Sequence, residues 1–285
     1  MKVSQAGIEN EPASGLSLRS TERGDDPSAP PGPPELSRRS FARESLGALV
    51  GAAAVETVVA DDTAPAERLQ ASAAPQITCG VSSGDVTATR AVLWSRSDRP
   101  ARMLVELATD ADFTQVRHVE GPVTSPTRDF TAKVEVRGLT PGSTWHYRVR
   151  FQDLHDPQLV GPPQVGTFRT PAREPADIRF VWSADTAGQG YGIDRERGGM
   201  RTYAAMLERD PDFLVHCGDH VYADNPIPPE IALDDGSIWR NVTTPETSRA
   251  AETLEEFRAR YRYNFLDDHF RRFHAAVPIV AIWDD

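Results

Sequence analysis

The sequence contains very little cysteine. Its 285 residues include two cysteines, Cys79 and Cys217, and no Cys-x-x-Cys spacing. Two isolated cysteines do not form a disulfide scaffold, and they give no indication of a zinc or redox motif. Cys217 lies inside an apolar stretch, which is typical of a small buried hydrophobic side chain.

Positive charge and long hydrophobic runs are also scarce. Lys and Arg number 31 against 42 Asp and Glu, a net charge of −11. This balance argues against nucleic acid or an anionic membrane as the main partner, while bound metal ions would still supply a local cationic site. The uncharged run Ser45–Val55 is too short for a stable membrane span, and the hydrophobic content of 39% is that of a soluble globular protein.

The N-terminal part divides into two segments by composition. Residues 1–36 are rich in Pro, Gly, Ser and charge, and are predicted to be disordered. In residues 37–75, Arg38 and Arg39 precede Phe41 and an apolar run, a pattern similar to a twin-arginine export signal. This predicts contact with the export machinery and a periplasmic or secreted protein. An amphipathic linker helix is the alternative.

Residues 76–171 are predicted to form a β-sandwich. Short stretches of β-forming residues alternate with turn signals, and no helical period separates them. The stretches are AVLWSRS, RMLVELAT, FTAKVEVRGL and WHYRVRF. The segment LTPGSTWHYRV resembles a fibronectin type III motif carried by Leu139, Trp145 and Tyr147, with Trp145 in the usual tyrosine place. A cell-surface binding module is therefore one functional alternative.

Residues 172–285 change to an α/β pattern. DIRFVWSAD and PDFLVHCGD are predicted strands that flank a helix in GGMRTYAAMLERD, with Met200, Tyr203 and Leu207 on one face. A further helix from Thr253 to about His274 and a third strand, VPIVAIW, continue the series. Parallel α/β sheets hold their ligand sites at the carboxyl ends of strands.

Each of the three predicted strands ends in acid: Asp185, Asp219, and the pair Asp284 and Asp285. Several carboxylates at one sheet edge repel one another by several kcal/mol unless a cation neutralises them. Carboxylate oxygens suit Ca, Mg, Mn, Fe or Zn, and a phenolate from Tyr222 favours ferric iron. A polar turn is the alternative interpretation of Asp219–Asp224.

Five motifs in order resemble one known family. They are the arginine pair, GVSSGDVTATRAVLWSR, SADTAGQGYGI, DPDFLVHCGDHVYAD and VPIVAIWDD. The chain is similar from about Ser37 to Asp285 to the PhoD-type alkaline phosphatases and phosphodiesterases of the calcineurin-like metallophosphoesterase superfamily. The resemblance implies a fibronectin III-like sandwich followed by the first part of a four-layer αββα metallophosphoesterase domain.

The resemblance also implies site residues. Asp219 matches a carboxylate that bridges two metals, Tyr222 an iron-binding tyrosine, and Asp185 a first metal ligand that is a cysteine in the best-described branch. Asp219, His220 and Asp285 are the implied catalytic residues. Ca and Fe(III) are the expected metals, with Zn, Mn and Mg left open.

Neighbouring residues receive structural interpretations. GQGYG at 188–192 is expected to be a flexible loop over the site, and Asp224 with Asn225 to order the loop of Tyr222. Thr186 is not needed as a nucleophile. Three further histidines are interpreted as structural: His216, His269 and His274.

The sequence thus predicts an exported, monomeric, metal-dependent hydrolase of small phosphate esters, of which this chain is expected to be an incomplete and inactive catalytic unit. The competing hypothesis is a truncated, non-catalytic fragment. In the family, the motif that matches VPIVAIWDD is followed by His-Glu and a metal-binding Asn. This sequence does not include these residues, which is the basis of this hypothesis.

Overall fold

The computed structural model describes residues 74–188 and 190–282. The described residues all belong to one unit. The predicted disordered segment, the arginine pair Arg38 and Arg39, and the acids Asp284 and Asp285 lie outside the described residues. No helix among the described residues is long and apolar enough to cross a membrane.

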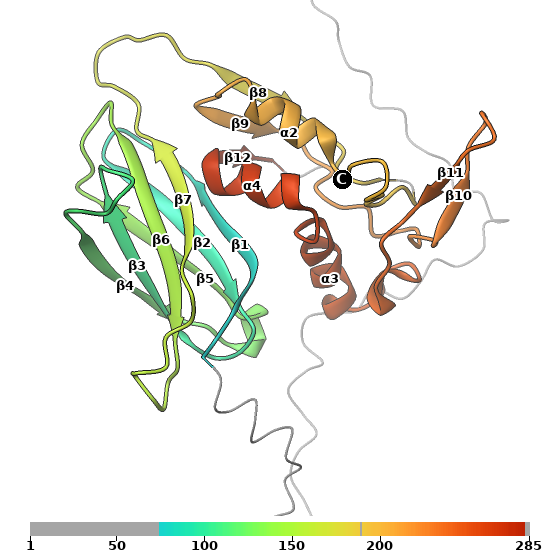
Figure 1. Cartoon of the computed structure of the whole chain (residues 1–285), viewed down its shortest axis with the longest axis horizontal. Helices are drawn as coiled ribbons and strands as arrows, with labels where there is room; N and C mark the ends of the chain where they lie inside the picture. The colour runs from blue at the N-terminus through green and yellow to red at the C-terminus, as the bar shows by residue number, and fades with distance from the viewer. Residues whose placement is uncertain (1–73, 189, 283–285) are drawn as a thin grey trace, which may run out of the picture. The chain divides into compact units, whose positions relative to one another are not determined.

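Seven antiparallel strands form a two-sheet sandwich between residues 77 and 169. They are β1 (Ile77–Gly84), β2 (Arg90–Ser97), β3 (Arg102–Ala108), β4 (Arg117–Val123), β5 (Thr131–Arg137), β6 (Thr144–Gln152) and β7 (Gln164–Arg169). One sheet has the order β4-β3-β6-β7, and β5-β2-β1 make up half of the other (Figure 1). Buried residues alternate with more exposed ones along β2 and β6, as expected for strands with one face on a core.

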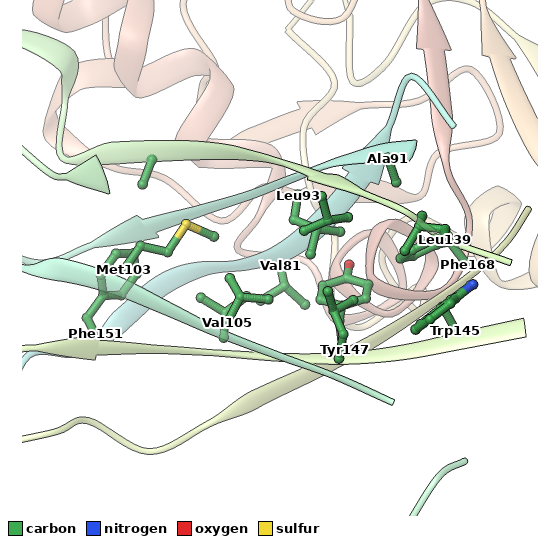
Figure 2. Packing of buried hydrophobic residues seen from close by; sticks show 14 of the residues in the cluster. Val81, Ala91, Leu93, Met103, Val105, Leu139, Trp145, Tyr147, Phe151 and Phe168 are labelled. Carbon is green, nitrogen blue, oxygen red and sulfur yellow. The ribbon is translucent and has the colours of Figure 1, made fainter. Parts of the chain in front are cut away.

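The sandwich core fills the space between these two sheets. Side chains from both sheets interleave, and Tyr147 and Phe151 are fully buried (Figure 2). Leu139, Trp145 and Tyr147, which carry the fibronectin-like motif, are all buried. The indole Nε1 of Trp145 has no hydrogen-bond partner among the described residues, so this tryptophan does not replace the hydrogen bond of a corner tyrosine.

The α/β pattern gives the predicted β-α-β unit. Strands β8 (Phe180–Ser183) and β9 (Phe213–His216) are parallel, with α2 (Arg201–Leu207) between them in sequence, and β12 (Ile279–Ala281) pairs with β9 in parallel. Helices α2 and α4 (Asp268–Ala276) lie beside this sheet (Figure 1). Met200, Tyr203 and Leu207 pack together in the core beneath them, as the helical period predicts.

The prediction of one continuous helix from Thr253 to about His274 is wrong. The segment is α3 (Leu254–Asn264) and then α4, separated by a turn. The Asp267 carboxylate accepts hydrogen bonds from the backbone amides of Phe270 and of Met200. An aspartate at this position starts a new helix and ties it to the segment before α2.

Four short elements complete the described secondary structure. These are η1 (Pro126–Arg128), the antiparallel pair β10 (Glu230–Ala232) and β11 (Ile238–Arg240), and η2 (Pro245–Thr247). The β10–β11 hairpin follows the loop that carries Tyr222, and the sequence patterns did not predict it.

The predicted boundary at 171–172 separates the two strand patterns but does not separate two sheets. Strand β1 pairs in parallel with β12 at Gly84 and Ile279, so one six-stranded sheet runs in the order β5-β2-β1-β12-β9-β8. A Cβ atom on Gly84 would lie 2.9 Å from the carbonyl oxygen of Ile279. Glycine at this position therefore permits the close approach of the two backbones.

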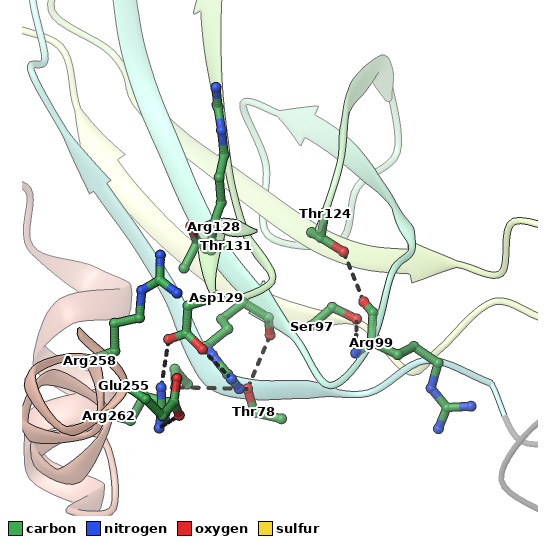
Figure 3. A network of polar contacts seen from close by, with 12 residues as sticks. Thr78, Ser97, Arg99, Thr124, Arg128, Asp129, Thr131, Glu255, Arg258 and Arg262 are labelled. Atoms are coloured by element: carbon green, nitrogen blue, oxygen red, sulfur yellow. Dashed lines mark hydrogen bonds and ion pairs between the residues drawn. The ribbon is translucent and has the colours of Figure 1, made fainter. Parts of the chain in front are cut away.

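Polar contacts tie α3 to the sandwich. Asp129 binds Arg96 at 2.8 Å and Arg262 of α3 at 2.9 Å, and Arg258 donates to the carbonyl of Thr127 (Figure 3). Burial opposes ionisation of Asp129, but the hydrogen bonds and charges of Arg96 and Arg262 outweigh it and lower the pKa of this carboxyl. We call the cluster of Arg96, Asp129 and Arg262 the joint between the sandwich and α3. The rings of Trp94 and Phe265 also stack, with their centroids 5.3 Å apart.

Candidate metal centre

Two aspartates follow the carboxyl ends of the neighbouring strands β8 and β9. Backbone hydrogen bonds continue past the strand ends: the amide of Asp185 donates to Gly218, and that of Thr186 to Asp219. Asp185 and Asp219 have positive φ angles of 57° and 51°. Aspartate tolerates this left-handed backbone better than most residues. The two turns thus lie side by side and present their acids together.

Tyr222 joins the two carboxylates. Its hydroxyl donates to Asp185 Oδ1 and lies 2.7 Å from Asp219 Oδ2. The hydrogen bonds to Asp185 and Asp219, together with the charge of these carboxylates, raise the pKa of the Tyr222 phenol. The three residues predicted as metal ligands are therefore within contact distance of one another.

This donor set fits a hard cation. Two carboxylates and a phenol direct oxygen atoms to one place, and oxygen is the donor that Ca²⁺, Mg²⁺, Mn²⁺ and Fe(III) prefer. Among the described residues, no group of three His, Cys, Asp or Glu side chains is arranged to hold a metal ion. The third donor here is the tyrosine, and Asp285, the third predicted catalytic residue, is not among the described residues.

His220 lies beside the acids but does not bind them in the described structure. Its ring stacks on that of His216 with centroids 3.7 Å apart, and its backbone carbonyl accepts from Asn264 Nδ2 at 2.8 Å. Burial lowers the pKa of His220, and burial followed by the charge of His220 lowers that of His216 to about 4. Both rings are therefore neutral near pH 7.

Thr186 is not placed as a nucleophile. Its side chain is buried, and its hydroxyl lies 2.9 Å from His216 Nε2 and 2.8 Å from the hydroxyl of Tyr203. His216 is thus a hydrogen-bonded core histidine, as predicted. His274 is also buried, among the rings of Tyr203, Phe265, Phe270 and Phe273. Cys217 is only half-buried, which corrects its prediction as a buried side chain.

The glycine-rich loop lies against Tyr222. A Cβ atom on Gly188 would come within 2.4 Å of the Tyr222 ring, so the loop contacts the site as predicted. Asn241 fixes this loop: its side chain accepts from the amide of Gly192 and donates to the carbonyls of Gly190 and Pro228. The sequence did not predict this role of Asn241, because the groups that it contacts are distant in the chain.

Helix α3 orders the loop that carries Tyr222. Arg260 is buried and donates to the carbonyls of Asn225 and Arg249, while Asn264 donates to His220. Asn225 takes part through its backbone, and the predicted role of Asp224 is not tested by these contacts. The sequence shows only that Arg260 and Asn264 are four residues apart and so share one helix face; their burial is a finding of the structure.

A cavity of about 690 Å³ lies elsewhere, under the linker that follows β7. The linker residues from Arg169 to Ile178 and the beginning of β9 line it, together with parts of the sandwich. None of the predicted site residues lines this cavity, so the cavity is not evidence for a ligand site at Asp185 and Asp219.

Comparisons with known proteins match both strand patterns to one family. Residues 62–172 match the family model "PhoD-like phosphatase, N-terminal domain", and residues 180–285 match "PhoD-like phosphatase". Alkaline phosphatase D from Bacillus subtilis (strain 168) is 27% identical over 221 residues, which are 73% of this chain and 34% of that protein.

A solved structure agrees with this match. The structure described as "Structure of PhoD" superposes with a TM-score of 0.59 and 26% sequence identity, over 75% of this chain and 40% of the other. The chain thus spans about a third of the curated relative's length. The two family models, the order of motifs and the shared fold agree, and the chain belongs to the PhoD-like phosphatase family.

Proposed function

We propose that the protein is a metal-dependent phosphoester hydrolase of the alkaline phosphatase D type. The observation that carries this proposal is the convergence of Asp185, Asp219 and Tyr222 at the ends of β8 and β9. Membership of the PhoD-like phosphatase family supports a phosphatase at the level of reaction class. Phosphate monoesters and diesters of small molecules are the proposed substrates.

Asp219 is proposed to bridge two metal ions, with Asp185 and Tyr222 as ligands of one of them. Ca and Fe(III) are the first candidates, and Zn, Mn and Mg remain alternatives for the same oxygen donors. Bound metal ions would stabilise the charge that develops on the phosphoryl oxygens and lower the pKa of water.

The protein's own residues supply charge and shape around that centre. Asp185 and Asp219 provide the negative charge that holds the cations, and the backbone bonds between their turns keep the carboxylates at a fixed separation. His220 follows Asp219 in the chain and stacks on the buried ring of His216, which supports its proposed role as a residue that contacts substrate. Asp285 is proposed as a further catalytic residue on the resemblance alone.

Metal-dependent turnover of p-nitrophenyl phosphate and of its bis ester tests the proposal. Asp219→Asn should lower both metal content and turnover at least 100-fold, because it removes an anionic ligand without changing the size of the side chain. Asp234→Asn, an exposed acid in the turn between β10 and β11, is the control and should keep both. Metal-independent turnover would rule out the proposed chemistry.

Two alternatives give different results in the same assay. A sandwich-based binding module, or a fragment without catalytic function, would show no turnover with any added metal. The fibronectin III-like character of residues 76–171 remains part of the proposal. It is supported by the burial of Leu139, Trp145 and Tyr147.

Export by the twin-arginine route is also proposed, to the periplasm or the medium. Arg38 and Arg39 followed by Phe41 support it. Changing both arginines to lysine keeps the charge and removes the guanidinium pair, so the protein should stay in the cytoplasm. Export of the Lys-Lys variant at the wild-type level would contradict this route. A monomer with no nucleic-acid partner is the proposed state of the exported protein.

A further inference from the structure

We propose that Thr186 is a positioning residue, whose buried hydroxyl joins β9 and α2 and holds the two metal-binding turns in register. The inference rests on the proposed function, because the turns matter as holders of a metal ion. It assigns a role to a side chain that does not touch the proposed ligand atoms.

The turns are already joined through their backbones. The amides of Asp185 and Thr186 donate to Gly218 and Asp219, at 3.3 and 2.8 Å, and Cys217 donates to Ser183 at 2.7 Å. These bonds fix the backbone of the first turn on the second. Of the three bonds, the one made by Asp185 is the longest.

The side chain of Thr186 supplies a second connection at this position. Its Oγ1 is 2.9 Å from His216 Nε2, at the end of β9, and 2.8 Å from the hydroxyl of Tyr203 on α2. All three side chains are buried. The threonine hydroxyl has one proton and two lone pairs, so it is able to make both contacts at once.

Tyr203 connects this hydroxyl to the rigid core. Its ring packs edge-on against Phe270 and Phe273 of α4, with centroids 4.8 and 5.4 Å away. His216 in turn stacks on His220, the residue that follows Asp219. The connection therefore runs from the α2–α4 core through Thr186 to both aspartate turns.

The backbone of the turns needs such support. Asp185, Ala187 and Asp219 all have positive φ angles, which are unfavourable for residues with a Cβ atom. Strained segments persist where surrounding contacts determine them. Thr186 lies between two of these residues and is the one whose side chain is anchored in the interior.

Isosteric substitution separates this role from general stability. Thr186→Val keeps the shape and loses the hydroxyl, whereas Thr186→Ser keeps the hydroxyl. Thr170→Val is the matched control: Thr170 is buried in the sandwich, and its hydroxyl contacts Thr140 and Ser143 rather than the metal-binding turns. Mn²⁺ alone is the probe, followed by equilibrium dialysis at a temperature where every variant is folded.

We expect Thr186→Val to weaken Mn²⁺ binding about 10- to 100-fold, the usual effect of removing a residue that orients a ligand. Thr186→Ser should bind within about threefold of wild type, and Thr170→Val should lose thermal stability but keep its Mn²⁺ affinity. If Asp219→Asn loses Mn²⁺ binding but Thr186→Val keeps the wild-type affinity, the role of Thr186 is wrong and the proposed function still holds. Retained metal in Asp219→Asn would instead contradict the proposed function.

Hydrogen exchange gives a readout that needs no metal. The amides of Asp185 and Thr186 should exchange at least tenfold faster in Thr186→Val than in wild type, while amides within the β3–β6 ladder stay unchanged. Equal exchange at these two amides would overturn the positioning role whether or not the protein binds Mn²⁺.

Discussion

The sandwich and the α/β region bury different kinds of side chain. Apart from hydrophobic residues, the sandwich buries only hydroxyl groups among the described residues: Ser83, Ser95, Ser97, Thr124 and Thr170. The α/β region buries ionisable and amide groups as well, including Asp194, His216, Glu256, Arg260, Asn264, Asp267 and His274. Buried ionisable groups oppose folding unless they are paired, so the stability of the α/β region depends on the partners of these groups.

The two regions also differ in how their sheets are covered. The sandwich core has side chains from both sheets, whereas α2 and α4 cover one face of β8, β9 and β12. On the other face, Phe180 and Trp182 are exposed by 50% and 72%, and Val280 and Ile282 are exposed as well. The described residues thus provide one sheet and one helix layer of the expected four-layer arrangement.

Breaking the sandwich core should have the largest effect on stability. Phe151→Ala should destabilise the protein by about 3–5 kcal/mol, because it removes a fully buried ring from a closed core. Urea unfolding measures this change. A loss below about 1 kcal/mol would contradict the closed packing between the two sheets.

Removing a charge from the joint between the sandwich and α3 should have the next largest effect. Asp129→Asn should cost about 2–3 kcal/mol, because Arg96 and Arg262 lose their shared, largely buried partner. Asparagine also tolerates the positive φ angle at this position. The control, Glu255→Gln, affects the exposed partner of the same Arg262 and should change stability by less than about 0.5 kcal/mol. Equal effects of the two variants would contradict the proposed importance of the joint.

Acid should destabilise the α/β region through His274. Burial, with the charges of His216 and His220, lowers the pKa of His274 from 6.5 to about 3. The folded state therefore stays neutral while the unfolded state takes up a proton below pH 6.5. From pH 7 to pH 5 this group should remove about 2 kcal/mol of stability.

Denaturant unfolding of His274→Phe beside wild type isolates that contribution. The variant should lose less stability than wild type over the same pH range, while His216, with its own low pKa, contributes to both proteins. The control Phe270→Leu, a non-titrating change on the same helix, should keep the pH dependence of wild type. Identical pH dependence in wild type and His274→Phe would contradict a buried neutral histidine.

The open sheet face should give the smallest effect. Trp182→Thr keeps a β-forming residue and should change the free energy of unfolding by less than about 0.5 kcal/mol, because the tryptophan is largely exposed. A loss approaching that of Phe151→Ala would show that this face is covered in solution.

The sequence predicted those parts of the site that depend on short spacings. Asp219 and Tyr222 are three residues apart, and Asp185 ends the neighbouring strand, so a parallel sheet brings the three together. The break between α3 and α4 was missed although Asp267 is a helix-capping residue type, because the apolar pattern continues through it. The roles of Asn241 and Thr186 were not predictable, since their partners lie in segments whose relative placement depends on the folded core.

Anomalous X-ray diffraction from crystals grown with Mn²⁺ is the most direct test of the metal centre. The account predicts a peak about 2.0–2.4 Å from carboxylate oxygens of both Asp185 and Asp219 and from the Tyr222 hydroxyl oxygen. The same peak should be missing in Asp219→Asn crystals. Wild-type crystals with no Mn²⁺ at these three oxygens, or with Mn²⁺ bound only elsewhere on the protein, would contradict it.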